Sequence, residues 1–270
     1  MSADSKSQWL SDSGIFVKRS GEFGSNSKVD KPIVLLHGLF GSLENVGGIA
    51  RLLSNEYGVY SLDLPNHGRS RHIDESSLST FADRIEACLD ELGLQESFVV
   101  GHSLGGKVAM EVALRKPSAV KKLAVLDIAP VKYPRRHDDV FQGLSSIDLR
   151  AIKSRGDADK LMKAQVPELA VRSFLLKNLY KIDDNYSWRM NLESIIEGYE
   201  QLINANASLT YENDVLFLKG ENSNYITEEY RKEILSRFPK TQLKIVSGTE
   251  HWLHAEKPDI VANIIQRFLA

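Results

Sequence analysis

Short runs of apolar residues recur along the chain and alternate with longer segments in which apolar side chains return every three or four positions. Six runs have the length and composition of strands, at residues 32–36, 59–62, 96–100, 123–126, 215–218 and 243–246, and the apolar runs at 32–36, 96–100 and 123–126 are typical of buried parallel strands. Four segments have helical periodicity, at about residues 45–55, 78–92, 107–115 and 257–269. This alternation predicts an α/β fold with a doubly wound, mostly parallel sheet.

Residues 131–208 interrupt the alternation. They are charged and amphipathic and contain no buried strand run, so we expect a helical cap inserted into a core made of residues 31–130 and 209–270. Residues 1–30 form a polar N-terminal segment that ends in a loop-like stretch, with an edge strand expected at residues 15–17. A chain of 270 residues, 42% hydrophobic and 26% charged, suffices for one large core.

Charge and cysteine content exclude several function classes. The formal net charge is −2 and no basic stripe is present, which argues against nucleic-acid binding. Cys88 is the single cysteine, so an internal disulfide is excluded and a cysteine-based zinc site is not expected. No apolar run approaches the roughly 18 residues of a membrane span. The first residues mix acidic and basic side chains without an apolar stretch, which is atypical of a secretory signal.

The run at residues 96–100 leads into Gly101-His102-Ser103-Leu104-Gly105-Gly106, and a helical segment follows. Strand, sharp turn and helix are the context that a G-x-S-x-G nucleophile elbow requires. The turn strains the backbone at Ser103, and glycines are needed where neighbouring atoms crowd it. Ser103 is therefore a candidate nucleophile, and the N–H of Leu104 is a candidate donor to an oxyanion.

A second donor is expected after the buried run at residues 32–36. An apolar strand followed by His37-Gly38 is where hydrolases of this type place the other oxyanion-hole N–H, and we assign it to Leu39. We interpret His37 as a structural residue that braces this loop. The segment Asp63–Ser70 also contains Asp, His and Ser, but its Pro, Asn and Gly mark a tight turn, so we interpret it as loop scaffolding.

A serine nucleophile needs a base within hydrogen-bond reach and a group that orients the base. His251 is the first histidine after the last predicted strand, which suits the chain order Ser, Asp or Glu, His. His254 is the alternative three residues later. The pair could suggest a metal, but no third ligand is visible nearby, and we expect no metal site. We favour His251 as the base and His254 as structural.

Two carboxylates compete for the role of the acid. Asp127 follows the buried run at residues 123–126, at the edge where parallel sheets bind ligands. An unpaired carboxylate there is costly, which indicates a partner, although a turn or cap residue is the simpler interpretation. Glu221 lies in the loop where many hydrolases carry the acid, but the expected slot holds Ser223. We favour Asp127 and keep Glu221 as the alternative.

Five stretches together carry a resemblance to a known family: His37–Ser42, Asp63–Ser70, Gly101–Lys107, Asp127–Pro130 and His251–Pro258. The chain resembles the α/β-hydrolase-fold serine hydrolases that include α/β-hydrolase-domain protein 11, small bacterial acyl esterases and yeast ethanol acetyltransferases. The stretches span most of the chain from residue 32 onward. The resemblance implies the α/β-hydrolase fold, a sheet of the predicted kind with a helical cap.

The resemblance also implies that Asp127 is the acid and that Ser223 assists the histidine. Glu250 departs from the family, which usually has glycine before the histidine. The implied activity is cofactor-free hydrolysis of small acyl esters or thioesters, with alcohol acetyl transfer as the alternative, in mitochondria or otherwise the cytoplasm. A non-catalytic binding protein on this fold is a further alternative, but such proteins typically lack one of the three site residues. The cap residues expected to set substrate size are Phe141, Leu144, Leu175 and Leu176.

Overall fold

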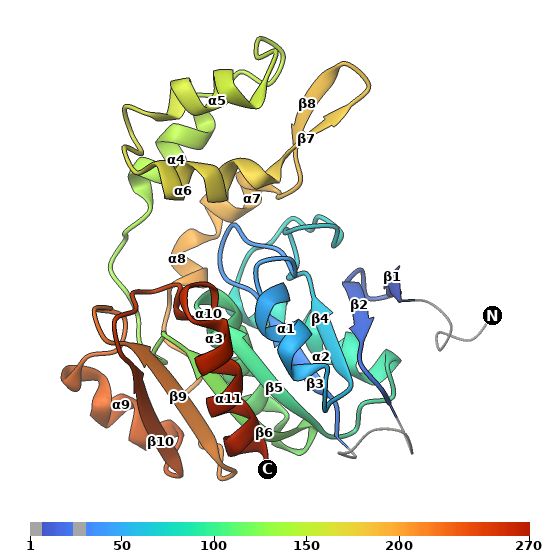
Figure 1. The fold of residues 1–270 in the computed structure, drawn as a ribbon, viewed down its shortest axis with the longest axis vertical. Coiled ribbons are helices and arrows are strands. Elements are labelled where there is room, and N and C mark those ends of the chain that lie inside the picture. The colour runs from blue at the N-terminus through green and yellow to red at the C-terminus, as the bar shows by residue number, and fades with distance from the viewer. Residues whose placement is uncertain (1–6, 24–30) are drawn as a thin grey trace.

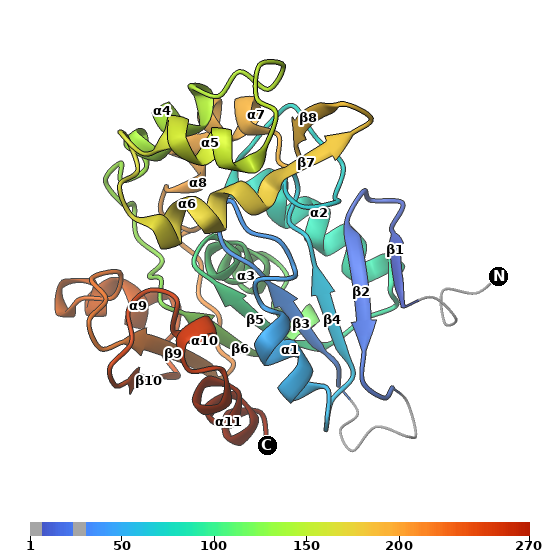
Figure 2. The ribbon, with the colours of Figure 1, turned by 45° about the horizontal axis from the view of Figure 1, so that its top comes forward.

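The computed structural model describes residues 7–23 and 31–270, which form one eight-stranded sheet with helices on both faces and a separate two-stranded hairpin (Figures 1 and 2). The order of the strands in the sheet is β1-β2-β4-β3-β5-β6-β9-β10. Their bounds are β1 Gln8–Leu10, β2 Phe16–Ser20, β3 Ile33–Leu36, β4 Val59–Leu62, β5 Ser97–His102, β6 Val120–Leu126, β9 Val215–Gly220 and β10 Thr241–Val246. All pairs from β4 to β10 are parallel, which confirms the predicted α/β-hydrolase fold.

The central strands are buried on both faces because side chains alternate between two hydrophobic cores. Val34 and Leu36 of β3 belong to one core, and Ile33 and Leu35 belong to the other. Helices α2 (Leu78–Glu91), α3 (Leu104–Arg115) and α9 (Arg231–Arg237) contribute to the first core. Helices α1 (Gly47–Leu53), α10 (Leu253–Glu256) and α11 (Pro258–Leu269) contribute to the second. This two-sided burial explains why the strands have almost continuous apolar sequences.

The segment between β6 and β9 stands over one end of the sheet, as Figure 1 shows. It differs from the expected all-helical insertion because the strands β7 and β8 form an antiparallel hairpin within it. Both strands are half-buried or exposed over most of their length, so they lack the apolar run that marks a core strand. The elements are α4 Asp138–Ser145, α5 Arg155–Met162, α6 Leu169–Leu175, β7 Leu179–Ile182, β8 Asn185–Trp188, α7 Leu192–Glu197 and α8 Tyr199–Leu202.

The N-terminal part of the chain adds two strands to one edge of the sheet. The strand expected at residues 15–17 exists as β2, but it is not the edge itself: it pairs with β4 on one side and with β1 on the other. Much of the polar segment predicted for residues 1–30, including most of its loop-like end, lies outside the described residues. Short 3-10 helices complete the fold, at Pro117–Ala119, Leu176–Asn178 and Glu228–Tyr230.

Across residues 7–23 and 31–270, no helix has both the length and the apolar character needed to cross a membrane. Cys88 is buried in α2, where burial raises the pKa of its thiol to about 12.

Candidate active site

Ser103 occupies the turn between β5 and α3, with a backbone φ of 52° that L-residues rarely adopt. The neighbouring glycines are required by close approach of the backbone. A Cβ atom on Gly101 would lie 2.2 Å from the carbonyl oxygen of Gly105, and one on Gly105 would lie 2.4 Å from that of His37. The glycines therefore let the strand and helix close tightly enough to hold Ser103 in its strained conformation.

Three side chains from distant parts of the sequence form a hydrogen-bonded series. His251 Nε2 lies 3.0 Å from Ser103 Oγ, and His251 Nδ1 lies 2.8 Å from Asp127 Oδ2. Because a carboxylate only accepts, Nδ1 carries the proton and Nε2 is free to accept the Ser103 hydroxyl. The structure thus brings together the residues favoured as nucleophile, base and acid.

Asp127 follows β6 directly, is fully buried and has a φ of 53°. Besides His251, its carboxylate accepts the Gly220 N–H at 3.1 Å and the hydroxyl of Ser223. These donors compensate the buried charge, which would otherwise be costly. Ser223 therefore contacts the acid candidate rather than the histidine.

The alternative candidates lie elsewhere. Glu221 is exposed and accepts the backbone N–H of Gly248 at 2.7 Å, without a bond to either ring nitrogen of His251. His254 is buried against His102, with 4.1 Å between ring centroids, and burial lowers its pKa to about 4. His102 Nε2 in turn lies 2.9 Å from the carbonyl oxygen of His251 and so holds that loop. Glu250 has an exposed side chain.

The two predicted oxyanion donors flank Ser103. Leu104 is the first residue of α3, so its N–H has no acceptor within the helix. Leu39 lies in a turn closed by a bond from Gly41 N–H to the Gly38 carbonyl at 3.0 Å, and its own N–H has no hydrogen-bond partner among the described residues. Leu39 and Leu104 both line a cavity at Ser103.

The Leu39 turn is fixed by its surroundings. His37 Nδ1 donates to the Gly38 carbonyl at 2.8 Å, and His37 Nε2 accepts the Leu64 N–H at 3.0 Å. His37 is fully buried and burial lowers its pKa to about 4, so it is a neutral brace. From the insertion, Asn178 Nδ2 donates to the Phe40 carbonyl at 2.7 Å.

The segment Asp63–Ser70 acts as scaffolding, because its carboxylate is used by the backbone. Asp63 accepts the N–H groups of Leu43 at 2.6 Å and Arg69 at 2.8 Å. Burial raises the pKa of Asp63 to about 6, with these bonds opposing the shift. Neither of its carboxylate oxygens is bonded to Ser103 or His251.

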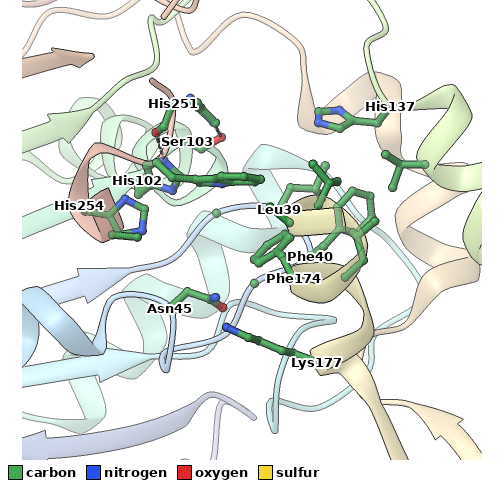
Figure 3. A pocket seen from close by; sticks show the side chains of 18 of the residues that line it. Leu39, Phe40, Asn45, His102, Ser103, His137, Phe174, Lys177, His251 and His254 are labelled. Carbon is green, nitrogen blue, oxygen red and sulfur yellow. Dashed lines mark hydrogen bonds between the residues drawn. The ribbon is translucent and has the colours of Figure 1, made fainter. Parts of the chain in front are cut away.

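A cavity of about 350 Å³ opens beside Ser103, between the sheet and the insertion (Figure 3). Of the four cap residues expected to line the site, only Leu175 does so. Phe141, Leu144 and Leu176 are buried inside the insertion, where they pack within the first core. The amphipathic pattern of the insertion predicts that these side chains are buried, but it does not predict whether they face the cavity or the core. The aromatic and aliphatic side chains that the insertion supplies to the wall include Val140, Val171 and Phe174.

A second, smaller cavity of about 40 Å³ is also lined by Ser103. Its wall includes Tyr225, whose ring stacks on His251 with centroids 3.8 Å apart and planes inclined by 17°. Its wall also includes His137, which lines both cavities. Neither residue was predicted from the sequence to belong to the site. For Tyr225 the available signal was its position two residues after Ser223.

No three His, Cys, Asp or Glu side chains are grouped so as to hold a metal ion anywhere in the described ranges. The site offers a hydroxyl, an imidazole hydrogen-bonded to it, a buried carboxylate and backbone N–H groups. This donor set suits attack of the hydroxyl on a carbonyl carbon and stabilisation of the resulting oxyanion.

Comparison with known proteins finds esterases and a lipase among the relatives of this chain. The chain is 35% identical to esterase YbfF of Escherichia coli K12, over 90% of this chain and 95% of that protein. It is 34% identical to the mouse sn-1-specific diacylglycerol lipase ABHD11, over 88% of this chain and 80% of the relative. A more distant relative, a probable alcohol acetyltransferase of Wickerhamomyces anomalus, is 30% identical over 90% of this chain and 80% of its own.

The solved structure of a marine microorganism esterase superposes with a TM-score of 0.89 at 35% identity, covering 94% of this chain and 98% of the other. The sequence profile of the alpha/beta hydrolase fold matches residues 31–258, which include the nucleophile elbow, Asp127 and His251. The chain therefore belongs to the α/β-hydrolase fold family.

Proposed function

We propose that this chain is a serine hydrolase that cleaves small acyl esters or thioesters through an acyl-enzyme on Ser103. The observation that carries the proposal is the hydrogen-bonded series from Asp127 through His251 to Ser103, which opens onto a cavity of about 350 Å³. That volume falls within the usual range for small-molecule sites. The esterase and lipase names of the relatives support ester hydrolysis.

In the first step, Ser103 gives its proton to His251 Nε2 while Oγ attacks the acyl carbonyl carbon. The N–H groups of Leu39 and Leu104 donate to the oxyanion, and each such donor is worth about 3–4 kcal/mol in a studied protease. Asp127 keeps the proton on Nδ1 and stabilises the imidazolium. His251 then protonates the departing alcohol or thiol as its bond to carbon breaks, which leaves the acyl group on Ser103.

In the second step, water gives a proton to His251 Nε2 and attacks the acyl carbon. Collapse of this intermediate breaks the bond to Ser103 Oγ, which regains its proton from His251, and the free acid leaves. Ser223 supports the acid in both steps because its hydroxyl donates to Asp127. The mechanism requires no cofactor.

Alcohol acetyl transfer is the second candidate function. In that reaction an alcohol takes the place of water in the second step and an acetyl thioester is the donor. The probable alcohol acetyltransferase among the relatives favours this alternative, and the same residues serve both reactions. A mitochondrial location stays a prediction from the resemblance, with the cytoplasm as the alternative.

The test measures turnover and covalent labelling together. Ser103→Ala should abolish hydrolysis of an activated short-chain ester and labelling by a fluorophosphonate probe. Ser236→Ala, the same change on the exposed surface of α9, should leave both intact. Labelling that survives Ser103→Ala would assign the nucleophile elsewhere, and a folded protein without any turnover would support the binding-protein alternative.

Incubation with acetyl-coenzyme A, with and without ethanol, separates the two enzymatic functions. Acetate alone supports hydrolysis, whereas ethyl acetate that appears only with ethanol supports transfer. If the fluorophosphonate probe labels the protein but neither product forms, acetyl thioesters are excluded as substrates. The proposal is then restricted to oxygen esters.

A further inference from the structure

The mechanism above leaves His137 unused, although it is a polar side chain of the site. It directly precedes α4, at the start of the insertion, and its side chain lines both cavities. Ser103 and Leu39 are the other residues common to both walls, so His137 lies where the two cavities meet beside the nucleophile. Figure 3 shows its ring pointing across the larger cavity toward Ser103 and His251.

The hydrogen bond of His137 to Tyr199 fixes which ring nitrogen carries the proton. His137 Nδ1 lies 2.5 Å from the Tyr199 hydroxyl, which also accepts the Arg136 N–H at 3.4 Å. Tyr199 is buried, and among the described residues its hydroxyl has no acceptor other than Nδ1. Because a buried O–H without an acceptor is costly, the hydroxyl donates to Nδ1, and the neutral ring carries its proton on Nε2.

The ring of His137 is neutral at pH 7. Burial lowers the pKa of His137 to about 4, and the nearby charges of His251 and Arg136 act in the same direction, while Asp138 opposes them. Nε2–H is thus an uncharged donor, and it has no partner in the part of the chain that the structure describes. A donor with these properties is suited to bind an oxygen atom of the substrate.

The proposed mechanism indicates which substrate oxygen this donor would meet. His251 Nε2 protonates the departing group in the first step and deprotonates the incoming molecule in the second. Both must therefore occupy the same place beside His251, and this is the region that His137 faces from across the cavity. We propose that His137 Nε2–H donates a hydrogen bond to the oxygen of the departing alcohol, and to the water or alcohol that replaces it.

This inference rests on the proposed function and adds a selectivity to it. Oxygen is a strong hydrogen-bond acceptor and divalent sulfur is a weak one. An N–H placed at the departing atom therefore favours an oxygen ester over the thioester with the same acyl and alkyl groups. A residue that only shapes the cavity would affect both substrates alike.

The experiment compares kcat/KM for ethyl butyrate and S-ethyl thiobutyrate, following butyrate release from both. In His137→Phe the aromatic ring can keep its edge contacts to Phe40 and Tyr199, whose centroids lie 5.9 and 5.6 Å away. His137→Phe leaves the Tyr199 hydroxyl without an acceptor, so the double variant His137→Phe/Tyr199→Phe removes that hydroxyl as well. His137→Gln retains an N–H donor. Val140→Ala changes an apolar side chain of the same wall and serves as the matched control.

We expect the ester-to-thioester ratio of kcat/KM to fall about tenfold in both Phe variants, the factor for one hydrogen bond worth about 1.4 kcal/mol. The ratio should stay within about threefold of the unmodified protein in His137→Gln and Val140→Ala. A ratio that is unchanged in the double variant, while both rates fall together, overturns the role of His137 and leaves the proposed function standing. Turnover that persists in Ser103→Ala instead overturns the proposed function.

Discussion

Lowering the pH from 7 to 5 should destabilise this protein strongly, because it buries histidines that stay neutral in the folded state. Burial lowers the pKa of His37 and His254 to about 4 and that of His67 to about 3. The unfolded chain binds a proton at each of these residues near the ordinary value of 6.5. Stability is therefore complete above about pH 6.5 and is lost as the pH falls toward the folded pKa values.

The magnitude follows from these pKa values. At pH 5 the unfolded state gains about 2 kcal/mol from each of the three histidines, because it is protonated there and the folded state is not. Asp63 acts in the opposite direction. Burial raises its pKa to about 6, so as the pH falls its carboxyl binds a proton in the folded state before it does in the unfolded state, which adds about 1 kcal/mol to the stability at pH 5. The net loss from these four groups is about 5 kcal/mol, and His137, whose pKa burial also lowers to about 4, adds about 2 kcal/mol. This loss is comparable with the whole stability of many proteins.

Thermal unfolding followed by circular dichroism between pH 5 and 8 tests this expectation. The midpoint should be nearly constant from pH 7 to 8 and fall by about 10 °C or more by pH 5. His254→Leu removes one titrating group and should reduce the loss of stability by about 2 kcal/mol. His72→Gln, at an exposed histidine, is the control and should behave as the unmodified protein does. A midpoint that stays constant down to pH 5 would refute the reasoning.

Three further predictions concern the site. Asp127→Asn should reduce kcat by a factor on the order of 10⁴, as loss of the acid does in a studied protease. Glu221→Gln should have a mild effect on kcat, and Ser223→Ala an intermediate one. All three variants are assayed on one activated ester, and an inactive Glu221 variant beside an active Asp127 variant would reverse the assignment. Gly101→Ala should destabilise or misfold the elbow because its Cβ would meet backbone 2.2 Å away; an unchanged unfolding midpoint contradicts this. Phe174→Ala should enlarge the cavity and shift the kcat/KM profile of p-nitrophenyl esters toward longer acyl chains, and an identical profile would show that the wall does not set acyl length.

The central strands of the sheet could be predicted from the sequence because burial on both faces gives a continuous apolar run. β4 has the predicted bounds, and β3 differs by one residue, since continuous apolar runs define such strands directly. The short strands β1, β7 and β8 could not be found in this way. They are only partly buried, and their pairing depends on partners elsewhere in the chain.

The site residues also fall into those that could be predicted from the sequence and those that could not. Ser103 could be identified because the elbow is a local motif whose glycines are required by its own geometry. Asp127 and His251 could be proposed from their positions at strand ends. The roles of Tyr225 and His137 could not, because their positions depend on how the loop after β9 and the insertion fold over the sheet. Periodicity shows that a helix face is buried, but not which surface it meets.

The proposed base, His251, follows an edge strand of the sheet. Ser103 and Asp127 follow two central strands, whereas His251 follows β10, which among the described strands pairs only with β9 and has exposed residues at positions 242–245. Edge strands open locally with a lower free energy than the centre of a sheet. Opening of β10 would displace His251 while both hydrophobic cores persist. Inactivation should therefore precede global unfolding on heating, and amide hydrogen exchange in β10 should report the enzyme's working limit more closely than the melting temperature does.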